Sequence, residues 1–110
     1  NNTLYFRYME DARIAWMQAL GLLDATMQYA PILARIECDF RRPVTYPGDV
    51  LVRQVVSHVG RTSVAHDVAI VQADDPAQMV ATGKSVVVWL DYSTGQPVPW
   101  TDQQRALFSV

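Results

Sequence analysis

The side chains that could act as bases, nucleophiles or metal ligands are few and scattered along the 110-residue chain. His58 and His66 lie eight residues apart, on what the pattern predicts to be successive strands, with no cysteine beside them. We favour two ordinary strand histidines over a metal ligand or a base. Cys38 occupies an apolar position of an alternating segment, which indicates a core residue and not a nucleophile. Glu10 is most simply a surface charge on a helix, spaced to pair with Arg13 at i+3.

Anion recognition would depend on a small number of arginines. Arg41, Arg42 and Arg61 each lie beside a predicted turn, where they could hold an anionic group or could be solvated charges at strand ends. The formal net charge is −2, so no surface for nucleic acid or an anionic membrane is indicated. The sequence contains no GxGxxG or Walker loop, no cysteine pair and no Gly-x-Ser-x-Gly elbow. We therefore predict neither a metal site nor a cofactor.

A helix from Asn2 to about Leu20 is predicted to position the N-terminal residues. Asn1 or Asn2 suits the N-cap, and Gly21 suits the left-handed position that follows a helix. Leu22–Pro31 shows no clear period, so we predict an irregular connection that holds a short helix or lines a pocket. The helix is amphipathic, because its larger apolar residues share one side of a 3.6-residue wheel, namely Tyr5, Met9, Ala12, Trp16 and Leu20.

Four strands are predicted after the helix. A period of two begins near Arg35 and runs to Arg41, and the later strands are predicted at Val50–Val59, Thr62–Gln72 and Met79–Leu90. The predicted turns contain Tyr46-Pro47-Gly48-Asp49, Gly60-Arg61 and Asp74-Asp75-Pro76, with a further turn region from Asp91 to Pro99. A short C-terminal helix capped by Thr101 is predicted to run to Phe108. This order predicts an α+β fold in which an antiparallel sheet covers the apolar side of the helix.

Length and composition predict one domain that spans residues 1–110. Half of the residues are hydrophobic, yet no apolar run approaches the ~20 residues that would span a bilayer. A basic segment followed by an apolar stretch is not found at the N-terminus, and Cys38 is the single cysteine. We therefore expect a cytoplasmic protein that makes no membrane contact.

The first thirteen residues follow the pattern Asn-Asn-x-x-Tyr-x-x-Tyr-x-Glu-x-Ala-Arg, which resembles the helix of hotdog-fold acyl-CoA thioesterases of the 4-hydroxybenzoyl-CoA thioesterase-like group. Further matches occur in the same order as in that family. They are Phe40-Arg41-Arg42-Pro43 with Pro47-Gly48-Asp49, Gly60-Arg61-Thr62-Ser63, Ala81-Thr82-Gly83 leading into Val87-Val88-Trp89-Leu90-Asp91, and Gly95-Gln96-Pro97-Val98-Pro99. The resemblance covers essentially the whole chain.

This resemblance implies a hotdog fold and a homodimer, or a dimer of dimers, with sheets joined edge to edge and an active site at each interface. It implies that a backbone N–H at the helix start polarises the thioester carbonyl, a role that maps to Asn1 with Asn2 beside it. Free N–H groups and a helix dipole of about +0.5 charge suit an oxyanion, and one such donor is typically worth ~3–4 kcal/mol in the transition state. Simple N-caps are the alternative for both residues.

The same resemblance suggests where acyl-CoA would bind. Arg61, Thr62 and Ser63 would hold the pantetheine arm, and Arg61 or Arg42 would meet the phosphates of CoA. Tyr5 would line the acyl side of the pocket. CoA enters as part of the substrate, and no separate cofactor is implied. The alternative for these positions is hairpin and turn residues that bind no ligand.

The chain departs from the family pattern at its beginning. The family's usual acid is an Asp a few residues before the Asn-Asn pair, and a strand precedes it. We therefore expect the first strand and the catalytic acid to lie upstream of Asn1. If the base comes from within the chain, Glu10 is the best candidate.

Three functions fit the sequence. The first is hydrolysis of acyl-CoA thioesters, and the second is non-catalytic binding of an acyl thioester of CoA or acyl carrier protein. The third is a hotdog dehydratase or hydratase, which needs a paired histidine and acid. Neither His58 nor His66 lies in such a motif.

Overall fold

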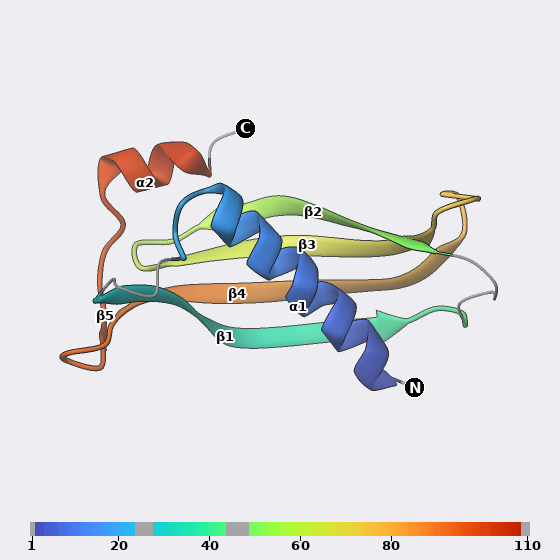
Figure 1. Ribbon diagram of the computed structural model, residues 1–110, viewed down its shortest axis with the longest axis horizontal. Helices are drawn as coiled ribbons and strands as arrows, with labels where there is room; N and C mark the ends of the chain where they lie inside the picture. The colour runs from blue at the N-terminus through green and yellow to red at the C-terminus, as the bar shows by residue number, and fades with distance from the viewer. Residues whose placement is uncertain (1, 24–27, 44–48, 109–110) are drawn as a thin grey trace.

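The computed structural model describes residues 2–23, 28–43 and 49–108. Asn1 and the predicted turn at Tyr46-Pro47-Gly48 lie outside these residues. In chain order, and with the labels of Figure 1, the elements are α1 (Asn2–Ala19), β1 (Tyr29–Phe40), β2 (Val50–Val59), β3 (Ser63–Gln72), β4 (Met79–Asp91), β5 (Gln96–Pro97) and α2 (Asp102–Leu107). No helix among the described residues has the length and apolar character needed to cross a membrane.

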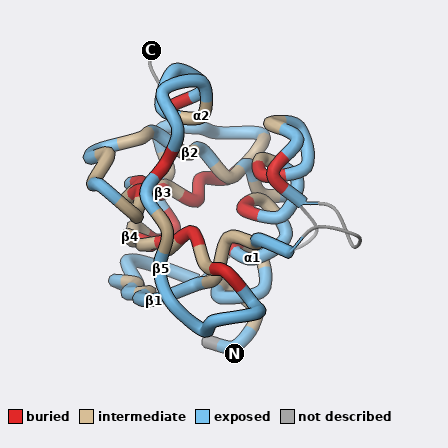
Figure 2. The backbone as a smooth tube through the Cα atoms, turned by 90° about the vertical axis from the view of Figure 1, so that its left-hand side faces the viewer, coloured by how far each residue is buried: buried red, intermediate tan, exposed pale blue. Residues whose placement is uncertain are grey.

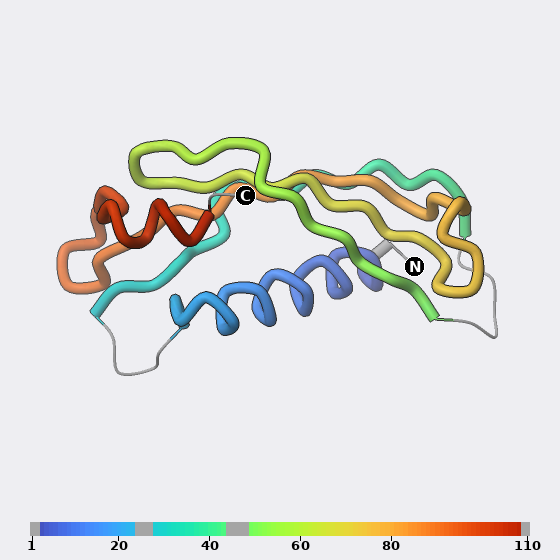
Figure 3. Tube along the Cα trace, turned by 90° about the horizontal axis from the view of Figure 1, so that it is seen from above, coloured from blue at the N-terminus to red at the C-terminus, as the bar shows by residue number. Residues whose placement is uncertain are grey.

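The sheet is antiparallel, as predicted. Its strand order is β1-β4-β3-β2, and the short β5 pairs with β4. The two edges of the four long strands are therefore β1 and β2. Helix α1 crosses one face of this sheet diagonally (Figure 1), and the sheet arches over the helix (Figure 3). This arrangement confirms the predicted fold, a sheet wrapped around one long helix.

The helix buries one stripe of side chains against the sheet. Met9, Arg13 and Met17 follow one another at intervals of four residues, and all three are at most 9% exposed. The sequence predicted Glu10 to be a surface charge spaced to pair with Arg13, and Glu10 is indeed on the surface. Arg13 faces the sheet.

Two buried apolar clusters fill the space between helix and sheet, where the buried parts of the trace gather (Figure 2). The first contains Met17, Leu22, Val64, Val87, Trp89, Trp100 and Phe108. The second contains Met9, Val68, Ile70, Val80 and Ala81. Aromatic rings stabilise the first cluster, because Trp89 and Trp100 stack with ring centroids 5.3 Å apart.

Two segments differ from the prediction. Strand β1 begins at Tyr29, inside the segment predicted to be irregular, and β5 lies inside the region predicted to be a turn. The register of β1 against β4 shifts between Leu33 and Arg35, so the period of two is clear only after the shift. Pro31 is tolerated in this strand because β1 is an edge of the sheet.

The C-terminal helix α2 forms where it was predicted, with Thr101 as its N-cap. The hydroxyl of Thr101 accepts from the Gln104 backbone N–H at 3.1 Å, and the Gln104 side chain accepts from the Thr101 N–H at 2.9 Å. These reciprocal bonds form a capping box at the start of α2. The helix is anchored to the β2–β3 hairpin, because Arg105 donates to the carbonyl of Gly60 at 2.8 Å.

Candidate active site

Helix α1 begins at one end of the sheet, near the last residues of β1 (Figure 1). Asn1 is outside the described residues, and α1 starts at Asn2. The first turn contains no acidic residue, so no carboxylate there opposes the positive end of the helix dipole. The start of the helix therefore offers a favourable position for an oxyanion.

An aromatic cluster lies beside the first turns of α1. The half-buried Tyr5 packs on Phe40 of β1 with ring centroids 5.0 Å apart, and Phe6 meets the same ring edge-on at 6.1 Å. Phe6 and Phe40 are 38% and 41% exposed. Tyr5 thus belongs to an apolar wall that an acyl group could contact.

Arg42 lies at this end of the sheet, but its surroundings are mixed in charge. Its backbone N–H donates to the carbonyl of Val80 at 3.1 Å, and its guanidinium donates to the Gln78 side chain. Asp74 and Asp75 line the same surface hollow. Two nearby carboxylates weaken the attraction of Arg42 for a phosphate.

Arg61 and Thr62 lie in the turn between β2 and β3, and Ser63 begins β3. This hairpin lies at the opposite end of the sheet from the start of α1 (Figure 1). The carbonyl groups of these residues already accept hydrogen bonds: Arg61 from the Trp100 N–H, Thr62 from the Trp89 N–H, and Ser63 from the Trp100 indole. The exposed Arg61 side chain and the half-buried hydroxyls remain as the groups that could meet a ligand. One chain alone does not bring this hairpin to the start of α1, because the molecule is 45 Å long.

Glu10 is exposed on α1 and lines a shallow hollow with residues of the same helix. It follows Asn2 by eight residues, which is about 12 Å along the axis at ~1.5 Å per residue. Glu10 therefore cannot act on a carbonyl held at the start of its own helix.

The two histidines and the cysteine occupy separate environments. Burial, with the nearby charge of Arg13, lowers the pKa of His66 from 6.5 to about 4, although Asp67 opposes the shift. His58 is exposed, and burial together with Asp39 raises the pKa of the Cys38 thiol. His66 is therefore a neutral core residue, and Cys38 is poorly suited to be a thiolate nucleophile. The described residues include no group of three or more His, Cys, Asp or Glu that could hold a metal ion.

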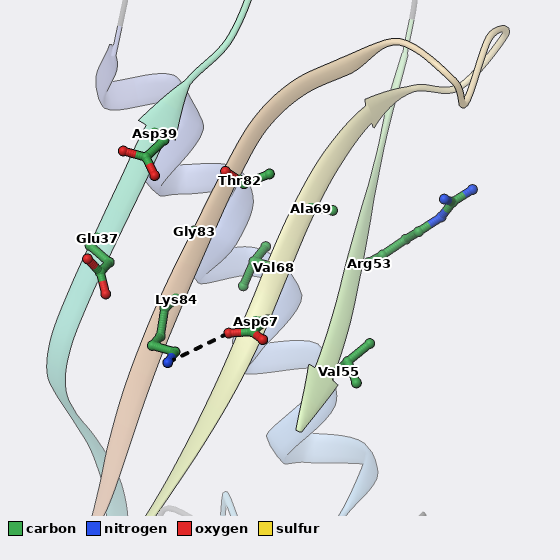
Figure 4. A pocket seen from close by; sticks show the side chains of 10 residues that line it. All are labelled: Glu37, Asp39, Arg53, Val55, Asp67, Val68, Ala69, Thr82, Gly83 and Lys84. Atoms are coloured by element: carbon green, nitrogen blue, oxygen red, sulfur yellow. Dashed lines mark ion pairs between the residues drawn. The ribbon is translucent and has the colours of Figure 1, made fainter. Parts of the chain in front are cut away.

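A hollow of about 550 Å³ lies on the sheet face opposite α1 (Figure 4). Its charged side chains come from four strands, and Lys84 lies 4.0 Å from Asp67. In its floor, the central strands β3 and β4 use their backbone N–H groups in ladder hydrogen bonds to both neighbours. The floor of this hollow therefore offers no free backbone donors for an oxyanion.

The sequence model of the Thioesterase-like superfamily matches residues 1–108. The chain belongs to this superfamily. The match includes the start of α1 as well as the hairpin residues, and the observed topology is that of a hotdog fold.

Solved structures of other thioesterases resemble this member of the superfamily. A candidate thioesterase from Pseudomonas aeruginosa is 28% identical, with a TM-score of 0.90 over 99% of this chain and 84% of that chain. A candidate acyl-CoA thioesterase from Xanthomonas campestris is 34% identical, with a TM-score of 0.74 over 83% of this chain and 77% of that one. A Thermus thermophilus thioesterase in complex with coenzyme A and Zn is 29% identical, with a TM-score of 0.79 over 98% of this chain and 77% of that one.

Sequence reasoning missed one polar group in this superfamily member, the buried Arg13. The signal was present, because Arg13 lies four residues after Met9 and four before Met17, on the same side of the helix. Arginine is charged and is usually exposed, so this spacing was not taken to indicate burial.

Proposed function

We propose that the protein hydrolyses acyl-CoA thioesters to a free acid and CoA. The observation that carries the proposal is the superfamily match over residues 1–108, which includes a helix whose first turn has no acidic residue. The resemblance to an acyl-CoA thioesterase candidate and to a thioesterase holding coenzyme A supports CoA as the carrier.

In the proposed mechanism, a backbone N–H at Asn1 or Asn2 donates to the thioester carbonyl oxygen. Water, activated by a carboxylate, attacks the carbonyl carbon, and the N–H donor stabilises the developing oxyanion. The C–S bond then breaks, CoA leaves as a thiolate, and the acyl group leaves as a carboxylic acid. A thiolate is a good leaving group, so strong acid assistance is unnecessary.

The mechanism requires a carboxylate that activates water. The described first turn of α1 contains none, and Glu10 is too far from that turn within one chain. An Asp preceding Asn1 therefore remains the first candidate. Glu10 is the alternative, and it would have to act at another position of a dimer interface.

A dimer would bring together the two groups of predicted binding residues. If two β1 edges pair antiparallel about a two-fold axis, the start of α1 in one protomer and the β2–β3 hairpin of its partner lie at the same end of the dimer. Arg61, Thr62 and Ser63 of the partner subunit could then hold the pantetheine arm and phosphates, while Tyr5 contacts the acyl group. The site is incomplete without the second copy.

The β1 edge has the composition expected of such an interface. Six partly exposed apolar residues lie on or beside it, namely Phe6, Ile14, Leu23, Tyr29, Leu33 and Phe40. Phe6 meets Phe40, and Ile14, Leu23 and Leu33 line one cavity together with Pro31. An unpaired strand edge with apolar neighbours favours association.

Thiol release from a panel of acyl-CoAs tests the proposal. The panel should contain short, long and aromatic acyl groups, and the protein should include any residues that precede Asn1 in its gene. Thiol release well above the uncatalysed rate is expected for at least one class. Lack of release from every acyl-CoA would overturn the proposal.

A non-catalytic acyl-thioester binding subunit is the second candidate. It is favoured by the lack of a carboxylate in the first turn of α1. Calorimetry would then detect binding of acyl-CoA or acyl carrier protein thioesters without turnover.

A further inference from the structure

Residues 60–63 connect β2 to β3, and each of their four carbonyl groups accepts a hydrogen bond from outside this turn. The donors are the Arg105 guanidinium for Gly60, the Trp100 N–H for Arg61, the Trp89 N–H for Thr62 and the Trp100 indole N–H for Ser63, at 2.8, 3.0, 2.8 and 2.9 Å. Trp100 and Arg105 therefore hold three of the four carbonyl groups of the turn.

The bond from Arg105 replaces one that would normally close the hairpin. Gly60 donates its N–H to the carbonyl of Ser63 at 2.8 Å. The reciprocal bond, from the Ser63 N–H to the Gly60 carbonyl, does not form among the described residues, and that carbonyl accepts from Arg105. A peptide unit is planar, so the orientation of the Gly60 carbonyl also sets that of the Arg61 N–H. Arg105 thus fixes the peptide unit that leads into Arg61.

The segment that supplies these donors is anchored in the core. Trp100 is 5% exposed, and its ring meets that of Phe108 with centroids 4.9 Å apart. Phe108 in turn packs on Trp16 of α1 at 5.9 Å. Arg105 lies between these two buried aromatic residues, in the last turn of α2. Its guanidinium therefore reaches Gly60 from a backbone that is held at both ends.

The two arginines at this corner differ in what their side chains do. Arg61 and Arg105 are both exposed, and neither forms a salt bridge within the described part of the chain. Nη1 of Arg105 is committed to the backbone of the hairpin. Arg61 is held through its carbonyl group, which leaves its guanidinium for a ligand. This division separates a cation that could bind a phosphate from one that holds the binding residue in place.

We propose that Arg105 is a positioning residue for Arg61 in the acyl-CoA site. The inference rests on the proposed function, in which Arg61 meets a phosphate of CoA. Arg105 does not touch the phosphate itself. Its bond to Gly60 orders the turn before the ligand arrives, so less conformational freedom is lost when Arg61 binds. Loss of Arg105 should therefore weaken CoA binding only while the Arg61 guanidinium is present.

Isothermal titration calorimetry at low salt tests this coupling, with free CoA as the probe. The wild type, Arg105→Met, Arg61→Ala and the double variant form a double-mutant cycle. Arg105→Met should raise the Kd of CoA by roughly threefold, and Arg61→Ala by roughly fivefold to tenfold. The double variant should bind CoA no more weakly than Arg61→Ala alone, because Arg105 then has no guanidinium to position.

Two further variants separate the hydrogen bond from the charge and from the fold. Arg105→Lys retains a side-chain donor for the Gly60 carbonyl, so it should bind CoA within about twofold of the wild type. Arg53→Met is the matched control, since Arg53 is an exposed arginine on the sheet face opposite α1. It loses the same charge and should retain the wild-type Kd.

Three results would overturn the positioning role. Independent effects of the two substitutions, whose fold-changes multiply in the double variant, would place Arg105 in direct contact with a phosphate. Wild-type affinity in Arg105→Met, or no CoA binding by the wild type, would remove the role altogether. Thiol release is measured separately. Coupling in a protein that releases no thiol would overturn the proposed hydrolysis and support this inference, whereas turnover without coupling would do the reverse.

Discussion

Met9 of α1 lies directly against Gly83 of β4. A Cβ atom at Gly83 would lie 2.8 Å from Cε of Met9 and 2.5 Å from the carbonyl oxygen of Glu37. The flexible end of Met9 can move, but the backbone of β1 is held by its ladder with β4. Gly83 therefore permits the helix and two strands to approach one another closely.

We predict that Gly83→Ala destabilises the protein by about 1–3 kcal/mol, because overpacking at a backbone contact has no easy relief. Urea unfolding provides the measurement. The neighbouring Thr82→Ala is the control, since Thr82 is only partly buried and makes a 3.3 Å exposed contact with Arg41. Equal stability of the Gly83→Ala variant and the wild type would contradict the close contact.

His66 predicts a pH dependence of stability. Its folded-state pKa of about 4 is below the ordinary 6.5, so the unfolded chain binds a proton that the folded chain excludes. The contribution of His66 to the free energy of unfolding is fully present above pH 6.5 and is lost as the pH falls toward 4. Between about pH 7.5 and 5, the free energy of unfolding should fall by roughly 2 kcal/mol from this group.

Unfolding of His66→Gln over the same pH range isolates this contribution. The variant should have a smaller slope, because glutamine does not titrate. His58→Gln is the matched control, because it makes the same substitution at an exposed histidine. A wild-type slope in His66→Gln would assign the pH dependence to other groups.

The elements with regular periodicity could be predicted from the sequence. Helix α1 and strands β2 to β4 follow clear patterns with capping or turn residues between them, although the register also shifts between Val56 and His58 in β2 and between Ile70 and Val71 in β3. The beginning of β1 could not be predicted, because the register shift near Leu33 interrupts the alternation and Pro31 argues against a strand. Strand β5 has only two residues, and it depends on pairing with Leu90 and Asp91.

The candidate site was less predictable because it depends on long-range geometry. The family resemblance implied that Tyr5 and Arg61 serve a site at a dimer interface. In the fold, the start of α1, which holds Tyr5, and the β2–β3 hairpin, which holds Arg61, lie at opposite ends of a single chain (Figure 1). Only a second copy could bring them together, and the sequence of one chain does not specify how two copies pair. The burial of Arg13 was missed for another reason, because a charged residue is normally assigned to the surface.

The cap of α2 provides a local test. Thr101→Ala removes the acceptor for the Gln104 N–H and should cost about 1 kcal/mol. Thr101→Ser retains the hydroxyl and should stay near wild-type stability. Thermal unfolding of the three proteins gives the comparison, and equal loss in both variants would show that the methyl group matters and the cap does not.

The proposed dimer predicts different effects at the two edges of the sheet. Leu33→Lys adds a charge on β1, so it should weaken the dimer, because charged side chains on an edge strand oppose pairing. Leu51→Lys is the matched control on β2, where Leu51 is 45% exposed. Sedimentation velocity measures the mass of each variant and of the wild type. Dimers of unchanged affinity in Leu33→Lys would exclude pairing through this edge.

Arg61 predicts a kinetic effect that separates binding from chemistry. The proposed function has this exposed guanidinium meeting a phosphate of CoA, and such a contact contributes equally to substrate and transition state. Arg61→Ala should therefore raise KM by roughly fivefold to tenfold at low salt with little change in kcat. The effect should shrink as added salt screens the charges. Arg53→Ala is the control, since Arg53 is exposed on the sheet face opposite α1.

An acyl-pantetheine substrate lacks the phosphates, so wild type and Arg61→Ala should hydrolyse it equally. An equal KM increase with that substrate would remove Arg61 from phosphate recognition and assign it to the fold of the hairpin.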